Sequence, residues 1–492
     1  MARAVHPHII TDDSALGGNV IDRSLRFVDA RLTFLTRTPS STGNRRTWTF
    51  SVWMKHSLIS SGRANTFFCS GTNNPDTIIK IDNDRFEISR YGGSYQTRVT
   101  SKALLRDPNS WYHFVGAVDT TQATSSNRVK LYINGDLVTE FDNSSYPSQN
   151  YEYPEMNNSG TPNYIGRHGH PTTQNFDGYM AEFNFVDGAQ LTPDNFGYTD
   201  PLTGIWRPKK VTGITYGTNG FYLDFSDNSG ATATTIGKDR SGNDNNYAPT
   251  NISVSAGNNN DSAIDSPIDN FVTLNPLRTQ NDNCILSNGN LKATGSNESY
   301  PGATGNVALS SGKWYYDFEI NNKAGSGHPL CGICQNDYIG GGPDRICYTA
   351  GGGYISAAPT EPQDPDSFAV GDIIGVAIDL DDAAGNIRFY KNGTLQPVLD
   401  ILNAVKAHLS ISTLGGLLPY IQMYHNDVCT INFGQTPFIH TPPTGFRALS
   451  VKNLTTTTGS SIADPREHFD TLIWDGTNNA SRDITGLQFK PD

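Results

Sequence analysis

The chain has 492 residues and a formal net charge of −12 at pH 7, and its length predicts about three units of ~100 to 200 residues each. Helix formers are scarce beside its 48 glycines, 27 prolines and many Asn, Ser and Thr residues, which predicts an all-β protein of short strands and tight turns. The acidic charge argues against a nucleic-acid partner, because phosphate binding needs clustered Lys and Arg.

Two further features bear on where such a protein is made. No run approaches the ~18 to 20 apolar residues of a membrane helix, and residues 1–22 lack the basic start and apolar core of a signal peptide. We therefore expect a soluble protein, without membrane insertion, made in a cytoplasm. The cysteines are too few and too irregularly spaced for a disulfide framework, so we expect free and mostly buried thiols at Cys69, Cys284, Cys331, Cys334, Cys347 and Cys429.

Residues 1–22 are polar and unpatterned, and they predict either an arm that orders against a partner or a frayed end. From Ser24 the apolar residues alternate with polar ones. In residues 47–55, Trp48, Phe50, Val52 and Met54 share one face of a predicted half-buried strand, and Trp53 interrupts the polar face. Further strands are predicted at 111–119, 129–133 and 179–186, with a type I′ hairpin turn at Asn134 and Gly135.

The phrases TWTFSVWMK, WYHFVGAVD, RVKLYINGDLV, NYIGR and FDGYMAEFNFVDGAQLT follow in this order, and residues 23–205 thereby resemble the laminin-G-like or concanavalin A-like jelly roll. Members of that family range from sugar binders to scaffolds, so the resemblance leaves the function open. Residues 206–270 are predicted to be a connector. It has one strand-like stretch at 220–225, and its Gly-, Ser-, Asn- and Asp-rich remainder is expected to lie as loops along the first sandwich.

Residues 271–450 carry the phrases GKWYYDFEI, GDIIGVAIDLDDAAGNIRFYKNGTL, LLPYIQMYHNDVCTINFGQTPF and PPTGFRAL, and they resemble the SPRY domain family. The resemblance implies a bent antiparallel sandwich whose loops at one end make any ligand contacts. A second hairpin turn is predicted at Asn392 and Gly393. Residues 451–492 are a spacer followed by what resembles the opening hairpin of a further β module.

Motifs for nucleophilic or phosphate chemistry are missing from the sequence: it has no G-x-S-x-G, H-E-x-x-H, Walker or G-x-G-x-x-G pattern. Asp317 and Glu319 share a strand face, but a solvated outer face is the favoured interpretation over a catalytic pair. Cys331 and Cys334 lie in a predicted strand, where positions i and i+3 point to opposite faces, so structural thiols are favoured over a metal or redox motif. No catalytic residue is predicted.

Metal binding has two candidate locations. His168 and His170 share a face and could bind an ion, but no third ligand is in view in the sequence, so ordinary packing is favoured. Calcium is an open alternative at the Asp-rich stretch 76–84 or at Asp119, because laminin-G-like domains often hold this ion. No other cofactor is expected.

Sugar binding needs exposed aromatic rings with amides and carboxylates nearby. Four tyrosines of the first module lie in Asn- and Ser-rich, loop-like surroundings and are the candidate ligand contacts, with ordinary loop packing as the alternative: Tyr91, Tyr95, Tyr151 and Tyr153.

A laminin-G-like module, a SPRY-like module and a spacer resemble, in this order, structural proteins of tailed bacteriophages. The resemblance implies a non-enzymatic virion protein, a tail fibre or tail-associated protein that recognises the host surface, with a host glycan as ligand. It further implies a homo-oligomer attached to other virion proteins through the N-terminal arm. The alternatives are a capsid decoration or head-fibre protein, a polysaccharide-depolymerising glycosidase, and a cellular adhesion or scaffold protein, which the missing signal peptide disfavours.

Overall fold

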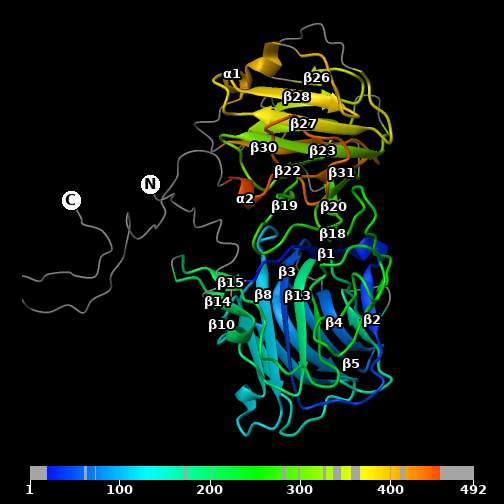
Figure 1. Cartoon of the computed structure of the whole chain (residues 1–492), viewed down its shortest axis with the longest axis vertical. Helices are drawn as coiled ribbons and strands as arrows, with labels where there is room; N and C mark the ends of the chain where they lie inside the picture. Colours follow the sequence, from blue (N-terminus) through cyan, green and yellow to red (C-terminus); the bar gives the residue numbers. More distant parts are fainter. Residues whose placement is uncertain are drawn as a thin grey trace, which may run out of the picture.

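The computed structural model describes residues 19–59, 64–72, 74–170, 174–201, 203–279, 284–296, 300–324, 328–335, 345–355, 366–398, 400–409 and 416–454. Two antiparallel β-sandwiches are stacked along the long axis of the molecule, with β1, β18, β19 and β20 at their junction (Figure 1). The predicted all-β architecture with two sandwiches in tandem is thereby confirmed.

The first sandwich pairs two eight-stranded sheets. One sheet has the order β10 (Asp136–Leu137), β9 (Val129–Ile133), β8 (Tyr112–Asp119), β3 (Thr47–His56), β13 (Gly178–Asp187), β1 (Ser24–Phe27), β18 (Ser262–Ala263), with β16 (Phe221–Leu223) also on β13. The other has the order β11 (Phe141–Ser145), β7 (Tyr95–Ser101), β6 (Arg85–Tyr91), β5 (Asp76–Asp82), β4 (Ala64–Gly71), β12 (Asn163–Ile165), β2 (Phe34–Arg37), β17 (Ala248–Thr250).

The second sandwich pairs a six-stranded with a seven-stranded sheet. The first of these has the order β19 (Leu274–Thr279), β22 (Gly302–Gly305), β30 (Leu417–Gln422), β24 (Leu330–Gln335), β25 (Arg345–Thr349), β26 (Tyr354–Ile355). The second has the order β20 (Cys284–Ser287), β21 (Lys292–Gly295), β31 (Val428–Asn432), β23 (Lys313–Asn322), β27 (Ile373–Asp379), β28 (Asn386–Lys391), β29 (Thr394–Leu395).

Helices are short and few in the described ranges, and none of them has the length and apolar character to cross a membrane. They are α1 (Val405–His408), α2 (Val451–Leu454) and the 3-10 turns at Asp29–Arg31, Ser125–Asn127, Pro193–Asn195 and Asp400–Asn403. The further β module predicted within 451–492 falls almost wholly outside the described residues.

Alternation along the strands places the core as predicted. Trp48, Phe50, Val52 and Met54 of β3 are fully buried between the two sheets of the first sandwich. Both predicted hairpins are present, because Asn134 and Gly135 have φ of 49° and 88°, and the Asn392–Gly393 pair repeats this geometry with 49° and 78°. Asn and Gly tolerate the positive φ that a type I′ turn requires at both positions.

The outer face of β3 is not half-exposed as predicted. Thr49, Ser51 and Lys55 are buried, with exposures of 0–1%. The chain after β13 folds back over this face: the Thr49 hydroxyl donates to Ala189 O at 2.7 Å, and a small sheet of β14 (Gly197–Thr199) and β15 (Trp206–Pro208) follows. Alternation within a strand reports only on its own residues, so it could not predict this cover.

Residues 206–270 were predicted to be a connector that lies as loops, and the strand pairing corrects this prediction. The segment supplies strands to both sheets of the first sandwich: β16 pairs with β13, β18 with β1, and β17 with β2. Its polar composition predicted loops, but three short stretches fill open sheet edges. The arm boundary at residue 22 shifts as well, because Ile21 is buried and Asn19 donates to Glu182 at 2.8 Å. Residues 1–18 lie outside the described residues.

The junction between the sandwiches is built around the ammonium group of Lys55. Its Nζ donates to the Asp265 carboxylate at 2.9 Å, to Asn270 Oδ1 at 2.7 Å and to the carbonyl of Phe271 at 2.9 Å. All three N–H bonds are therefore used, as a buried ammonium requires. Burial lowers the pKa of Lys55, and the Asp265 carboxylate opposes that shift.

Tyr179 of β13 adds an apolar contact to the junction. Its ring belongs to the hydrophobic core of the second sandwich, and its hydroxyl donates to Gly289 O at 3.0 Å. Gly289 has a φ of 67°, and a Cβ there would lie 2.6 Å from the Tyr179 hydroxyl, so glycine is required at this contact. The second module closes on itself through the bridge between Phe271 and Ser450.

We predict that Lys55→Met lowers the free energy of unfolding by about 3 to 5 kcal/mol, because it leaves the Asp265 carboxylate buried without its cation. The measurement is chemical denaturation followed by fluorescence and circular dichroism. The control is Lys102→Met, which removes an ion pair whose side chains are 66% and 75% exposed and should cost less than about 1 kcal/mol. Equal effects of the two substitutions would contradict the role given to Lys55.

Candidate functional site

The covered outer face of the β3–β8–β13 sheet contains a serine–histidine pair. Ser51 Oγ of β3 lies 2.8 Å from His113 Nε2 of β8, and Trp206 Nε1 donates to His113 Nδ1 at 2.9 Å. Indole is only a donor, so Nδ1 is unprotonated and the proton of the neutral ring sits on Nε2. His113 therefore donates to Ser51 and cannot remove the serine's proton.

The electrostatics of this pair agree with an inert role. His113 is fully buried, and burial lowers its pKa to about 3, so the ring stays neutral at physiological pH. The Trp53 ring stacks on it with the centroids 4.7 Å apart. Nucleophilic catalysis needs a base that accepts from the hydroxyl, and Trp206 fixes the opposite direction.

Glu182, next to this pair, is the buried carboxyl group of the same face. It sits at an irregularity in β13, where the register against β3 shifts between Ala181 and Asn184, and its φ is 51°. The Tyr222 hydroxyl donates to its carboxyl oxygen at 2.6 Å and Asn19 Nδ2 at 2.8 Å. Burial raises the pKa of Glu182 from near 4.5 to about 8, so the group is neutral at pH 7.

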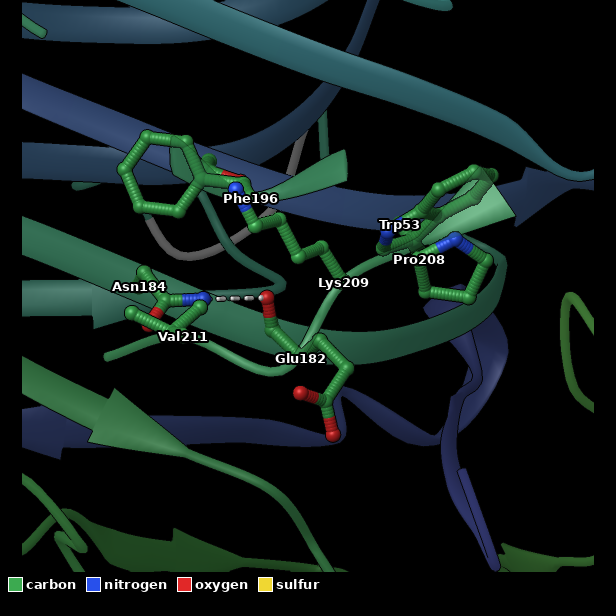
Figure 2. A pocket seen from close by; sticks show the side chains of 8 residues that line it. Trp53, Glu182, Asn184, Phe196, Pro208, Lys209 and Val211 are labelled. Carbon is green, nitrogen blue, oxygen red and sulfur yellow. Dashed lines mark hydrogen bonds between the residues drawn. The ribbon is translucent and has the colours of Figure 1, made fainter. Parts of the chain in front are cut away.

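A small cavity lies between Glu182 and the segment that covers the sheet (Figure 2). About 180 Å³ of space, open solvent included, lies between these side chains, whereas ligand pockets typically measure ~300 to 1,000 Å³. Figure 2 shows the Glu182 carboxyl group pointing away from Phe196 and Lys209. The cavity is thus too small for a sugar ring with its neighbours. Its walls are Ser51, Trp53, Glu182, Asn184, Phe196, Pro208, Lys209 and Val211.

The four candidate tyrosines form two separate pairs. Tyr91 and Tyr95 end β6 and begin β7, with ring centroids 5.0 Å apart and edge to face. Tyr95 is 45% exposed, and the Arg98 guanidinium lies 4.9 Å from its ring centroid. Gly92, Gly93 and Ser94 between them are exposed. Ligand contact by Tyr91 and Tyr95 stays a prediction.

The other pair consists of Tyr151 and Tyr153. Tyr153 is fully buried, its hydroxyl is 2.9 Å from the Thr97 hydroxyl, and its ring packs edge to face on Trp48. The prediction of Tyr153 as a ligand contact is therefore wrong, and half-buried Tyr151 packs against it with centroids 5.1 Å apart. The burial of Tyr153 could not be predicted from its own stretch of sequence, because Trp48 and Thr97, which it packs against, are distant in the chain.

An ion pair joins Arg90, the residue before Tyr91, to Glu155, which lies two positions after Tyr153. Arg90, beside Tyr91, donates to the Glu155 carboxylate at 2.8 Å and also to Gln96 Oε1. Glu155 in turn accepts from the Thr77 hydroxyl. Arg98 lies over the exposed Tyr95 ring, whereas Arg90 and Glu155 are buried on the core-facing side, where Arg90 pairs with Thr97. The sequence pattern did not indicate Arg90, Gln96 or Glu155.

Asp317 and Glu319 do not lie on a solvated face. Asp317 is 1% exposed, and burial raises its pKa to about 8, with a further contribution from Glu319. Glu319 accepts from Asn258 Nδ2 at 3.0 Å, so it contacts the chain before the second sandwich. Phe438 packs on Tyr315 of the same strand face, with centroids 4.9 Å apart. The outer face is covered by earlier chain at Asn258 and by later chain at Phe438, which corrects the sequence-based interpretation.

The thiol predictions are confirmed. All six cysteines are free and buried. Cys331 and Cys334 lie in β24, the first in the main core of the second sandwich and the second in a separate apolar cluster with Leu330 and Tyr420. Burial raises the pKa of Cys331 well above its usual range, so this thiol is not a nucleophile at neutral pH.

His168 and His170 do not converge on a common point, but His168 meets two other residues. Its Nε2 lies 2.8 Å from Asp76 Oδ2, and its Nδ1 accepts from the backbone N–H of His170 at 3.2 Å. Donor atoms of Cys69, Asp76 and His168 all lie within 4.8 Å of one another, and this is the one such group of three in the described ranges. The missing third ligand of the sequence analysis is thus supplied by residues far away in the chain.

The acidic residues suggested for calcium are engaged elsewhere. Asp84 accepts from Arg106 at 2.7 Å, Asp82 from Arg98 at 3.4 Å, and Asp119 from the side chains of Thr121 and Gln122. Binding of calcium to this stretch stays a prediction.

We predict that Glu182→Gln removes a pH dependence of stability. Glu182 keeps its proton in the folded chain up to about pH 8, whereas an unfolded glutamate loses it near 4.5, so this group destabilises the fold as the pH rises between those values. The difference in unfolding free energy between variant and wild type should change by about 1.4 kcal/mol per pH unit from pH 5 to 8. Glu140→Gln, at a 75% exposed side chain, is the control. Parallel curves for wild type and Glu182→Gln would refute the buried, neutral carboxyl group.

Comparison with known proteins locates both domains. Residues 34–195 match the family model described as the concanavalin A-like lectin/glucanases superfamily, and residues 313–436 match the SPRY domain model. No curated protein matches the chain.

Similar solved structures share little sequence with this chain. The SPRY domain of human HERC1 is 18% identical, covering 32% of this chain and 96% of that one, with a TM-score of 0.27. A heptameric SAP-like pentraxin from Limulus polyphemus is 14% identical (36% and 80% covered, TM-score 0.27). A protein of Bacteroides ovatus to which carbohydrate binding has been ascribed is 19% identical (47% and 58% covered, TM-score 0.30). The two family-model matches give a concanavalin A-like domain followed by a SPRY domain in this chain.

Proposed function

We propose that this protein is a non-enzymatic, glycan-binding structural component of a bacteriophage particle, a tail fibre or tail-associated protein that contacts the host surface. The observation that carries the binding part is the exposed Tyr95 ring on the β6–β7 hairpin, which packs edge to face on half-buried Tyr91 and has the Arg98 guanidinium over it. The order of the two domains supports the virion part by resemblance.

The tyrosine pair has the properties that sugar recognition uses. The C–H face of a pyranose ring stacks on an exposed aromatic ring, and its hydroxyl groups need fixed donors and acceptors close by. The edge-to-face contact of Tyr91 and the cation–π contact of Arg98 hold the Tyr95 ring in one orientation. A pre-arranged ring loses little entropy on binding, which favours affinity for a weakly held ligand.

The buried polar groups of the first sandwich support a non-enzymatic role. Glycoside hydrolysis uses two carboxyl groups ~5 to 10 Å apart on either side of the bond to be cleaved. Glu182 lies in a cavity too small for that substrate, and its carboxyl group is committed to Tyr222 and Asn19. Ser51 accepts a hydrogen bond from His113 instead of donating one to it.

Attachment to the particle is assigned to residues 1–18. We place the anchor in residues 1–18 because Asn19 and Ile21 already pack against the first sandwich. We also propose that the protein assembles in the host cytoplasm, forms oligomers with copies of this chain and contacts other virion proteins.

We predict that Tyr95→Ala weakens binding to host-surface polysaccharide about tenfold, which corresponds to about 1.4 kcal/mol, without release of reducing ends by either protein. Isothermal titration and a reducing-end assay on the same polysaccharide measure this. Tyr300→Ala is the matched control, because Tyr300 is 47% exposed in the other module and should not matter. Released reducing ends, or a loss of binding in Tyr300→Ala alone, would overturn the proposal.

Deletion of residues 1–18 should abolish incorporation into particles while leaving the melting temperature of the purified protein unchanged. Labelling the intact protein on particles in electron micrographs should place it at the tail. A label spread over the head lattice would favour the decoration alternative, and normal incorporation of the shortened chain would refute the anchor.

A further inference from the structure

Cys69, Asp76 and His168 come from three segments that the fold brings together. Cys69 lies in β4 and Asp76 begins β5, the next strand of the same hairpin. Cys69 pairs with Ile78, two positions beyond Asp76, so the side chains of Cys69 and Asp76 share one face of the sheet. That face points away from the core, which receives neighbouring Phe68. His168 follows β12, which pairs with β4 on its other side.

The three side chains are enclosed. Their exposures are 0% for Cys69, 2% for Asp76 and 6% for His168. The backbone after His168 lies directly on the β4–β5 turn, since a Cβ on Gly169 would be 2.5 Å from Gly71 O. The donor atoms are therefore held by three backbone segments in contact with one another, and they lie within 4.8 Å of each other.

We propose that Cys69, Asp76 and His168 form a binding site for a divalent cation of the zinc type. Thiolate sulfur, imidazole nitrogen and carboxylate oxygen are the three ligand kinds that Zn²⁺ accepts in a tetrahedral arrangement, and three protein ligands leave one position for water. Calcium and magnesium take oxygen ligands, so this set selects against them. A thiolate and a carboxylate balance the charge of the ion, which suits a buried position.

In the metal-free protein, the Cys69 sulfur and the His168 Nε2 atom each carry a proton where the cation would bind. The Nδ1 atom of His168 accepts from His170 N–H, so the neutral ring carries its proton on Nε2 and donates it to Asp76. The Cys69 thiol is 3.9 Å from Gly71 O, and burial together with the charge of Asp76 raises its pKa. A cation bound to sulfur replaces the thiol proton, which overcomes that shift.

The exchange balances with one proton released for each ion. Cys69 loses its proton to solvent, and the neutral imidazole moves its proton from Nε2 to Nδ1, where the 3.2 Å contact with His170 N has to lengthen. The ion would connect the β4–β5 hairpin to the chain after β12.

The test uses the full chain, stripped with a chelator and titrated with Co²⁺ and Zn²⁺. Co²⁺ should give one equivalent of the near-ultraviolet thiolate-to-metal band with the visible bands of tetrahedral cobalt, and Zn²⁺ should displace it and raise the melting temperature. Cys69→Ser should lose the near-ultraviolet band, whereas Cys347→Ser, a matched buried thiol of the second domain, should keep it. Asp76→Asn and His168→Gln should weaken binding at least tenfold, with circular dichroism as the check on folding.

The wild-type titration decides the question even where a variant fails to fold. Absence of the cobalt bands together with an unchanged melting temperature in Zn²⁺ would overturn the proposal. A near-ultraviolet band retained in Cys69→Ser would also overturn it, because the ion would then be bound elsewhere. Neither outcome bears on glycan binding at Tyr95, so the two proposals fail independently.

Discussion

The buried ammonium group of Lys55 joins the two sandwiches, together with the Tyr179–Gly289 and Asn258–Glu319 hydrogen bonds. Lys55 belongs to a central strand of the first sandwich, yet its partners are Asp265, Asn270 and the carbonyl of Phe271, which opens the second. The Asp265 carboxylate also accepts from the Trp111 indole at 3.0 Å and so holds β8 in the same network. Tyr179 adds an apolar contact, because its ring packs in the core of the second sandwich.

The inner faces of the sheets were predictable because their cause is local. Alternation in β3 and the two Asn–Gly turns depend on residues a few positions apart, and both were found where the sequence indicated. The outer faces were not, because distant chain covers them. Ser51, Asp317 and Tyr153 look like surface residues in sequence and are buried by segments that no short window contains.

The candidate sites divide in the same way. Tyr91 and Tyr95 flank a turn that the sequence shows, and His168 stood out as a ligating residue. The residues that surround them, Arg98 over Tyr95 and Cys69 with Asp76 near His168, lie on strands that pair within the sheet. Register, rather than motif spacing, brings these groups together, and a single sequence does not reveal register between strands far apart.

The threading of β16, β17 and β18 through the first sandwich affects how this architecture can change in evolution. These strands lie beyond the region that matches the lectin-like family model, yet they cover the edges of β13, β2 and β1. A gene fusion that cut at the end of that region would leave bare strand edges, which pair readily with other chains. The segment that would have to be exchanged as a whole is accordingly longer than residues 34–195. It extends through β18 to Asp265, the first partner of Lys55 in the chain.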